Sequence, residues 1–101
     1  MKLRLKTFQL TLVGAAVQLS STVIKTQVLK LKASANMHIS DSSSVSASNG
    51  FLLVANANES FDCLAHDPVG DINLSELYVI GTGTLYVSYL AQTVDTIPNP
   101  N

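Results

Sequence analysis

The chain has 101 residues, a formal net charge of -1 at pH 7 and only 13% charged residues. This length is typical of one domain, and the near-neutral balance excludes the broad basic face that a nucleic-acid binder needs. The single cysteine, Cys63, excludes an intrachain disulfide and is typical of a protein made in a reducing cytoplasm.

The N-terminus predicts one strand of about ten residues that ends at Gly14. Apolar residues occupy odd positions up to Leu5 and even positions from Phe8 to Leu12. Because side chains alternate between the two faces of a strand, this change of phase predicts a bulge or bend near Thr7.

The same N-terminus has the basic start and the apolar run of a signal peptide. We do not expect one, because the basic residues alternate with leucines, and Gln9, Thr11 and Gly14 interrupt the apolar run. The run is also too short to span a membrane. The sequence therefore predicts no membrane partner.

The middle of the chain predicts three strands and a loop. A short strand at Ala15–Leu19 precedes a longer one at Val23–Ala33, where leucines alternate with lysines as on a strand with one buried face. A third strand, Met37–Ser40, leads into the Ser-rich segment Asp41–Gly50. This segment ends in an Asn-Gly turn signal, and we expect it to be a loop.

The second half of the chain predicts two hairpins. The first joins Phe51–Val54 to Ser60–His66. The second joins Leu77–Ile80 to Thr84–Leu90 through the turn Gly81-Thr82-Gly83.

These strands and turns predict an all-β fold. Seven or eight short strands in about 90 residues are typical of a small antiparallel β-sandwich, jelly-roll-like or Ig-like, or of a β-barrel, and the pattern leaves these alternatives open. We expect residues 1–90 to form a single domain. Residues 91–101 lack a burial pattern, and Pro98 and Pro100 exclude a central strand. They form either an extended C-terminal arm that packs on a neighbour or a disordered end, and we favour the arm.

No group of residues predicts catalysis, a cofactor or a metal site. Cys63 and His66 form a lone C-x-x-H, whereas a structural zinc site needs four ligands. Asp62, Asp67 and Asp71 could supply calcium oxygens, but capping of turns is the more common use of such aspartates. We therefore expect a buried thiol, turn-capping carboxylates and no enzyme.

The tyrosines leave one binding alternative open. Tyr78, Tyr86 and Tyr89 could stack on sugar rings, as in a carbohydrate-binding module, but such residues are more often part of a core or an interface. The Gly81-Thr82-Gly83 segment is too short for a phosphate loop and has no lysine after it.

Short segments between Gln18 and Leu90 follow a pattern found in small virion proteins of tailed bacteriophages. The segments are QLS at Gln18–Ser20, VLKLKASAN at Val28–Asn36, SSVSASNG at Ser43–Gly50, NES at Asn58–Ser60, LYVIG at Leu77–Gly81 and YVSYL at Tyr86–Leu90. In these segments the chain resembles capsid decoration, or cement, proteins. It departs from them at Met37–Ser40, where an aromatic-Val-Gly strand is common, and at Asn56–Ser60, where a Pro-Gly-Glu-Ser turn is common.

The resemblance implies a structural protein that binds the outside of a bacteriophage head. Its partners would be the major capsid protein and itself, as a homodimer or homotrimer over junctions between capsid subunits, with no nucleic acid and no membrane. The protein would be synthesised in the host cytoplasm and end up on the capsid surface. Two alternatives remain: an adaptor in the neck, tail or fibre of the virion, and a carbohydrate-binding β-sandwich module.

Overall fold

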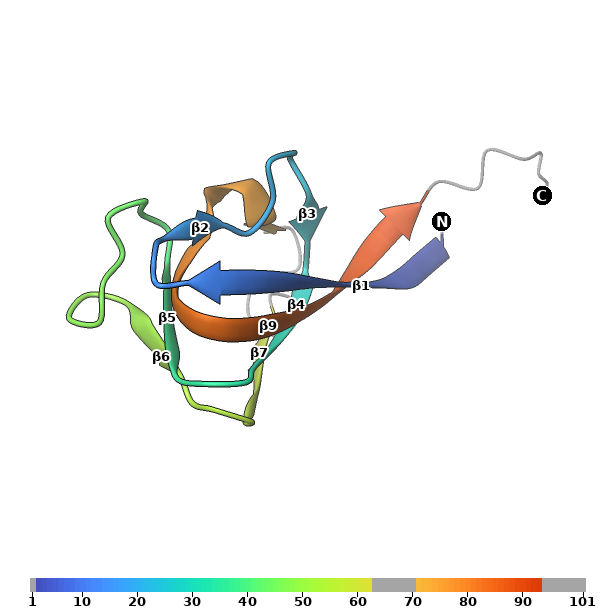
Figure 1. The fold of residues 1–101 in the computed structure, drawn as a ribbon. Helices are drawn as coiled ribbons and strands as arrows, with labels where there is room; N and C mark the ends of the chain where they lie inside the picture. The colour runs from blue at the N-terminus through green and yellow to red at the C-terminus, as the bar shows by residue number, and fades with distance from the viewer. Residues whose placement is uncertain (1, 63–70, 94–101) are drawn as a thin grey trace.

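The computed structural model describes residues 2–62 and 71–93. In this part of the chain, nine strands and one short 3-10 helix follow one another (Figure 1). They are β1 (Lys2–Val13), β2 (Val17–Gln18), β3 (Lys25–Thr26), β4 (Val28–Ala33), β5 (Met37–Ser40), β6 (Phe51–Leu53), β7 (Asn58–Asp62), β8 (Ile72–Asn73), η1 (Leu74–Glu76) and β9 (Tyr78–Thr93). All pairs of these strands are antiparallel, so the predicted all-β antiparallel fold is confirmed.

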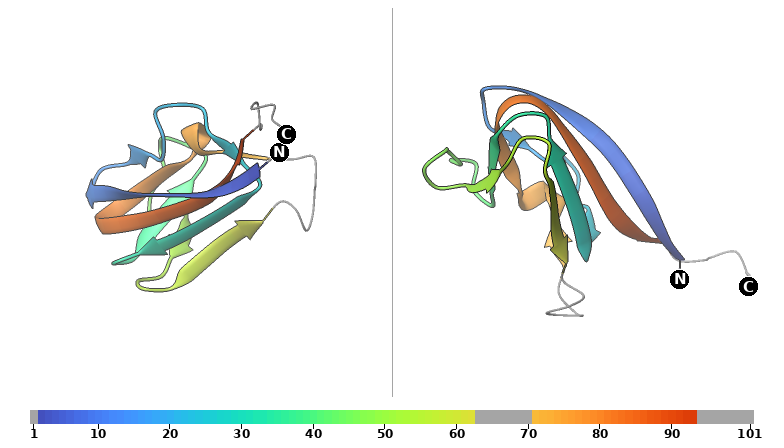
Figure 2. Two further views of the ribbon diagram at one scale, coloured as in Figure 1. Left: turned by 90° about the vertical axis from the view of Figure 1, so that its right-hand side faces the viewer. Right: turned by 90° about the horizontal axis from the view of Figure 1, so that it is seen from below.

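Strand β9 is central to two layers. Residues 78 and 79 lie between β2 and β5, and residues 85–89 lie between β1 and β4. The first layer therefore consists of β1, β9, β4 and β7, and the second layer consists of β2, β9, β5 and β6. Each strand of the first layer is joined through a corner to a strand of the second, so the seven strands of the two layers form one curled antiparallel sheet, a half-barrel (Figure 2). Strands β3 and β8 form a separate two-stranded sheet.

The corner within β9 depends on glycines. A Cβ atom at Gly81 would lie 2.7 Å from Cγ of Met37, so a side chain there would force β9 and β5 apart. Gly83 has a φ of +131°, which glycine adopts without strain, and a Cβ atom there would lie 2.6 Å from Oγ of Ser34. That oxygen accepts a hydrogen bond from the backbone N–H of Thr84 at 2.9 Å. The predicted hairpin at Gly81-Thr82-Gly83 is wrong, because these residues bend one continuous strand.

The predicted hairpin of Phe51–Val54 with Ser60–His66 is also wrong. Strand β6 pairs with β5 in the second layer, whereas β7 pairs with β4 in the first layer, and residues 54–57 form the corner between them. At this corner Oδ1 of Asn36 accepts a hydrogen bond from the backbone N–H of Ala55 at 2.8 Å. The backbone N–H of Asn56 donates to the carbonyl oxygen of Ala33 at 2.7 Å.

Strand β1 contains no bulge, which corrects the prediction at Thr7. It pairs with β9 residue by residue, from Lys2 opposite Thr93 to Val13 opposite Thr82. The unbroken alternation places Leu5 on the outer face of the first layer, where it is 65% exposed. Beyond the last β4 partner, β1 and β9 continue as a two-stranded ribbon (Figures 1 and 2).

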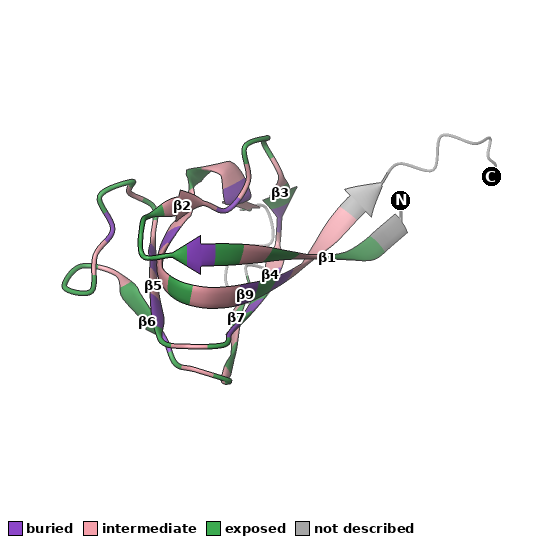
Figure 3. Cartoon of the chain, viewed as in Figure 1, coloured by how far each residue is buried: buried purple, intermediate pink, exposed green. Residues whose placement is uncertain are grey.

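The core lies between the two layers. In β4, Leu29, Leu31 and Ala33 are buried while Lys30 and Lys32 are exposed, as the alternation predicted. The buried apolar cluster consists of Leu12, Leu19, Leu29, Leu31, Ala33, Met37, Ile39, Leu53, Leu74, Val79, Leu85 and Val87 (Figure 3).

The predicted strand Val23–Ala33 is divided in two. Strand β3 pairs with β8, and only β4 joins the first layer. At the break, the buried hydroxyl of Thr26 donates a hydrogen bond to the carbonyl oxygen of Leu90 at 2.6 Å and accepts one from the backbone N–H of Val28 at 3.2 Å. These bonds fasten the start of β4 to β9.

The Ser-rich segment 41–50 forms no strand, as predicted. It folds against the second layer, because Val45 is only 4% exposed and a Cβ atom at Gly50 would lie 2.8 Å from Cβ of His38. At the other end of the chain, β9 runs to Thr93, past the predicted end of the last strand. The remainder of the predicted arm, residues 94–101, lies outside the described residues.

Candidate functional site

The residues considered for metal binding or catalysis are only partly described. Cys63, His66 and Asp67 lie outside the described residues. Asp62 ends β7 and Asp71 precedes β8. Within residues 2–62 and 71–93, no three histidine, cysteine or acidic side chains come close enough together to hold a metal ion.

The three tyrosines lie in different surroundings. Tyr89 is half-buried, with its ring centroid 6.2 Å from that of Phe8 in an edge-on contact. Tyr78 is half-buried in the second layer, opposite Ser40. Tyr86, by contrast, is 43% exposed on the outer face of the first layer. Of the three, Tyr86 is the most exposed.

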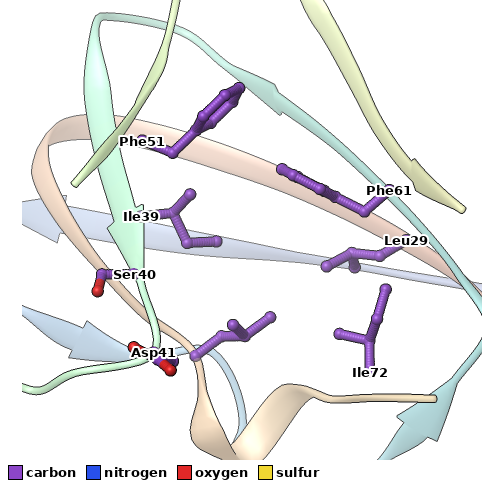
Figure 4. Close-up of a pocket in the computed structure, with 8 residues that line it drawn as sticks. Leu29, Ile39, Ser40, Asp41, Phe51, Phe61 and Ile72 are labelled. Carbon is purple, nitrogen blue, oxygen red and sulfur yellow. The ribbon is translucent and has the colours of Figure 1, made fainter. Parts of the chain in front are cut away.

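An apolar hollow lies between the two layers, on the side where β6 and β7 are the outermost strands (Figure 4). Its volume is about 300 Å³. It is lined by Leu29, Ile39, Ser40, Asp41, Phe51, Phe61, Ile72 and Leu77. The rings of Phe51 and Phe61 meet edge-on with centroids 5.7 Å apart, so the hollow is bounded by one ring from each outer strand. We call this cavity the inter-layer hollow.

The strand beside this hollow has an apolar edge. Strand β6 pairs with β5 on one side, and in the described part of the chain no strand pairs with its other side. Phe51 is 51% exposed, Leu52 43% and Val54 46%. We call these three residues and the unpaired side of β6 the β6 edge.

A second apolar region lies at the ribbon. Leu5 is opposite Leu90, and both side chains line a hollow of about 240 Å³ together with Val28, Lys30, Ser88 and Tyr89. We call it the ribbon hollow. The ribbon and β6 lie at opposite ends of the molecule (Figures 1 and 2).

Between these regions the outer face of the first layer is polar. Two rows of side chains cross its four strands: Gln9, Tyr86, Lys32 and Asn58 in one row, and Thr7, Ser88, Lys30 and Ser60 in the other. Six of these residues, together with Leu31 and Glu59, line an open depression of about 480 Å³. Lys32 and Lys30 are therefore flanked across the strands by neutral groups.

The prediction from sequence assigned no residues to a site and missed both apolar regions. One signal for the β6 edge is present in the chain, because residues 42–58 contain no charged side chain. A signal for the ribbon hollow is the shift of apolar residues from odd to even positions between Leu5 and Phe8. From the sequence alone, this shift predicts a bulge. In an unbroken strand, the same change of phase exposes a leucine.

No helix in the described residues is long and apolar enough to cross a membrane. Comparisons with protein-family models, with curated proteins and with solved structures found no match. The function is therefore proposed from the surfaces of this chain and from the segments that resemble capsid decoration proteins.

Proposed function

We propose that this protein is a structural subunit of a bacteriophage virion that decorates the outside of the head and cements junctions between major capsid subunits. One observation supports this function above the others: the molecule has two separate apolar contact regions, the β6 edge and the ribbon hollow, at opposite ends. A protein that strengthens a junction must contact at least two neighbours at once.

The composition of the surface agrees with such a role. Contiguous apolar groups on a soluble domain are typical of interaction sites, and a low content of charge is typical of the centre of protein interfaces. Only 13% of this chain is charged. Binding would bury Leu5 and Leu90 at one end and the β6 edge at the other, and the buried apolar area would stabilise the shell.

The test uses heads that lack the protein, to which the purified chain is added. We expect it to sediment with the heads and to raise the temperature at which they lose their contents. Leu5→Lys places a second charge beside Lys30 in the ribbon hollow and should raise the Kd for heads more than about tenfold, a loss of about 1.4 kcal/mol or more.

The matched control is Val13→Lys, on the same strand and the same outer face but at the far end of β1 from the ribbon hollow, where Val13 is 81% exposed. It should bind like the unmodified protein. Failure of the unmodified protein to bind heads would overturn the proposal, as would equal binding by the two lysine variants. Removal of residues 94–101 tests separately whether the predicted arm contributes to retention.

Two other functions remain as candidates. The first keeps the protein in the virion but places it in the neck, tail or fibre, where a few copies per particle are expected instead of the hundreds that cover a head. The second is carbohydrate binding, favoured by the exposure of Tyr86 among the polar rows of the first layer. Tyr86→Ala should abolish retention on a glycan array if that candidate is correct.

A further inference from the structure

The β6 edge has the properties of a strand that accepts another strand. The described part of the chain places no strand beside its outer side, and an edge strand of this kind presents backbone N–H and C=O groups with which another strand can pair. Soluble proteins usually protect such an edge with charged side chains, a proline or a bulge. Residues 50–57, GFLLVANA, contain no charge and no proline.

Apolar side chains are concentrated at the same place. Seven large apolar residues are exposed in the described part of the chain, and three of them, Phe51, Leu52 and Val54, lie within four consecutive positions. Leu52 and Val54 are on the outer face of the second layer, whereas Phe51 faces the inter-layer hollow (Figure 4). A strand added here would gain backbone hydrogen bonds and apolar contacts on both faces.

We propose that the occupant of the β6 edge is the β6 edge of a second copy, paired antiparallel about a two-fold axis at Leu52. This pairing makes a symmetric dimer in which the two second layers form one continuous sheet. The inference rests on the proposed function in one respect, because the second copy is then one of the two neighbours that the protein contacts. The test uses the purified chain alone, so failure to dimerise is distinguishable from failure to bind heads.

The sequence of β6 is complementary to itself in this arrangement. When two chains pair antiparallel about Leu52, Leu52 of one chain lies opposite Leu52 of the other, and Phe51 of each chain lies opposite Leu53 of the other. Every cross-strand pair is then apolar, and no like charges meet because residues 42–58 carry none. Alternation puts each Phe51 at the border of the neighbouring chain's inter-layer hollow, which the dimer would thereby cover.

Strand β7 is the natural comparison, because it is the outer strand of the first layer on the same side of the molecule. The same two-fold pairing about Ser60 would place Glu59 opposite Phe61 and Asn58 opposite Asp62. It would bury carboxylates against apolar or neutral groups, which is unfavourable. Self-pairing through β6 is therefore favoured over self-pairing through β7.

The experiment is sedimentation equilibrium of the purified chain from ~1 to ~100 µM, the range in which a modest protein interface is half-occupied. The unmodified protein should be a dimer that dissociates on dilution. Leu52→Lys puts two like charges directly opposite each other at the axis and should weaken the dimer more than about tenfold. Val13→Lys adds the same charge at a position 81% exposed on β1 and should leave the dimer unchanged. Far-UV circular dichroism of each variant shows whether the fold is retained.

A second variant gives a positive signal if Leu52→Lys does not fold. In a Cys63→Ser background, Leu52→Cys places the only thiol of each chain at the axis, and mild oxidation should join two chains covalently. Val13→Cys in the same background should remain largely uncrosslinked. A monomer at all concentrations, or a dimer that Leu52→Lys leaves intact, would overturn the proposal. If the chain is monomeric alone and Leu52→Lys abolishes only binding to heads, the edge accepts a strand of another protein and the dimer is excluded.

Discussion

The two outer strands on one side of the half-barrel, β6 and β7, are joined by only a short corner and yet have opposite surfaces. Strand β6 exposes phenylalanine and leucine and itself contains no charged residue, whereas β7 has Glu59 and Asp62 among polar residues. Both strands contribute an aromatic ring to the same hollow. Two neighbouring edges of one sheet therefore differ in polarity: the β6 edge is suited to contact with another protein, and the β7 edge is suited to contact with water.

This difference identifies what protects a free edge. The two strands have similar lengths of three and five residues and share one side of the sheet, so neither length nor position separates them. Charge separates them: a carboxylate must lose its hydration when another strand pairs over it, and leucine has no such cost.

The largest expected effect comes from removing the residue that anchors β6. Leu53 is 1% exposed, and Leu53→Ala should lower the free energy of unfolding by about 2–5 kcal/mol through a cavity in the core. Its neighbour Leu52 is on the opposite face, and Leu52→Ala should cost less than about 1 kcal/mol. Urea denaturation at one fixed protein concentration measures both, and equal losses would contradict the assignment of the two faces.

A smaller loss is expected at the start of β6. A Cβ atom at Gly50 would lie 2.8 Å from Cβ of His38 and 2.9 Å from Cγ2 of Val45, so the loop must move away from the second layer. Gly50→Ala should therefore cost about 1–3 kcal/mol. Ala47→Ser, at an exposed position of the same loop, is the control and should change the stability by no more than about 0.5 kcal/mol. A thermal unfolding temperature unaffected by Gly50→Ala would show that the loop does not pack as described.

A double-mutant cycle tests whether the two edges stabilise each other. Phe51→Leu and Phe61→Leu each remove one ring of the edge-on pair, whose centroids are 5.7 Å apart. We expect the double variant to lose about 0.5–1.5 kcal/mol less than the sum of the two single losses, because each single change already removes the contact between the rings. Additive losses in chemical denaturation would mean that β6 and β7 are energetically independent.

The smallest change in stability is expected from removing a charge on β7. Glu59→Gln should alter the free energy of unfolding by no more than about 0.5 kcal/mol. It should nevertheless increase self-association, because the carboxylate that opposes pairing along β7 is gone. Light scattering against concentration detects this, with Glu76→Gln, at an exposed position on η1, as the control for net charge. If Glu59→Gln self-associates no more than Glu76→Gln does, charge does not explain the difference between the β6 and β7 edges.

The sequence predicted the strands better than their partners. Alternation in β4 identified its buried leucines, and the polar composition of residues 41–50 identified the loop. The pairing could not be derived, because Gly81 and Gly83 permit a bend in one strand as readily as a turn between two. The β6 edge was missed for a similar reason: a short apolar run looks the same whether neighbouring strands cover both its sides or one.

The central position of β9 has a consequence for the order of folding. This strand pairs with β1, β2, β4 and β5, and all four precede it in the chain. During synthesis from the N-terminus, those strands leave the ribosome before the one that joins them, and their pairing across long stretches of chain is intrinsically slow. Until β9 emerges, the apolar β6 edge and the sides of β1, β2, β4 and β5 that pair with β9 all lack a partner strand. The newly made chain is therefore most vulnerable to aggregation just before β9 is made.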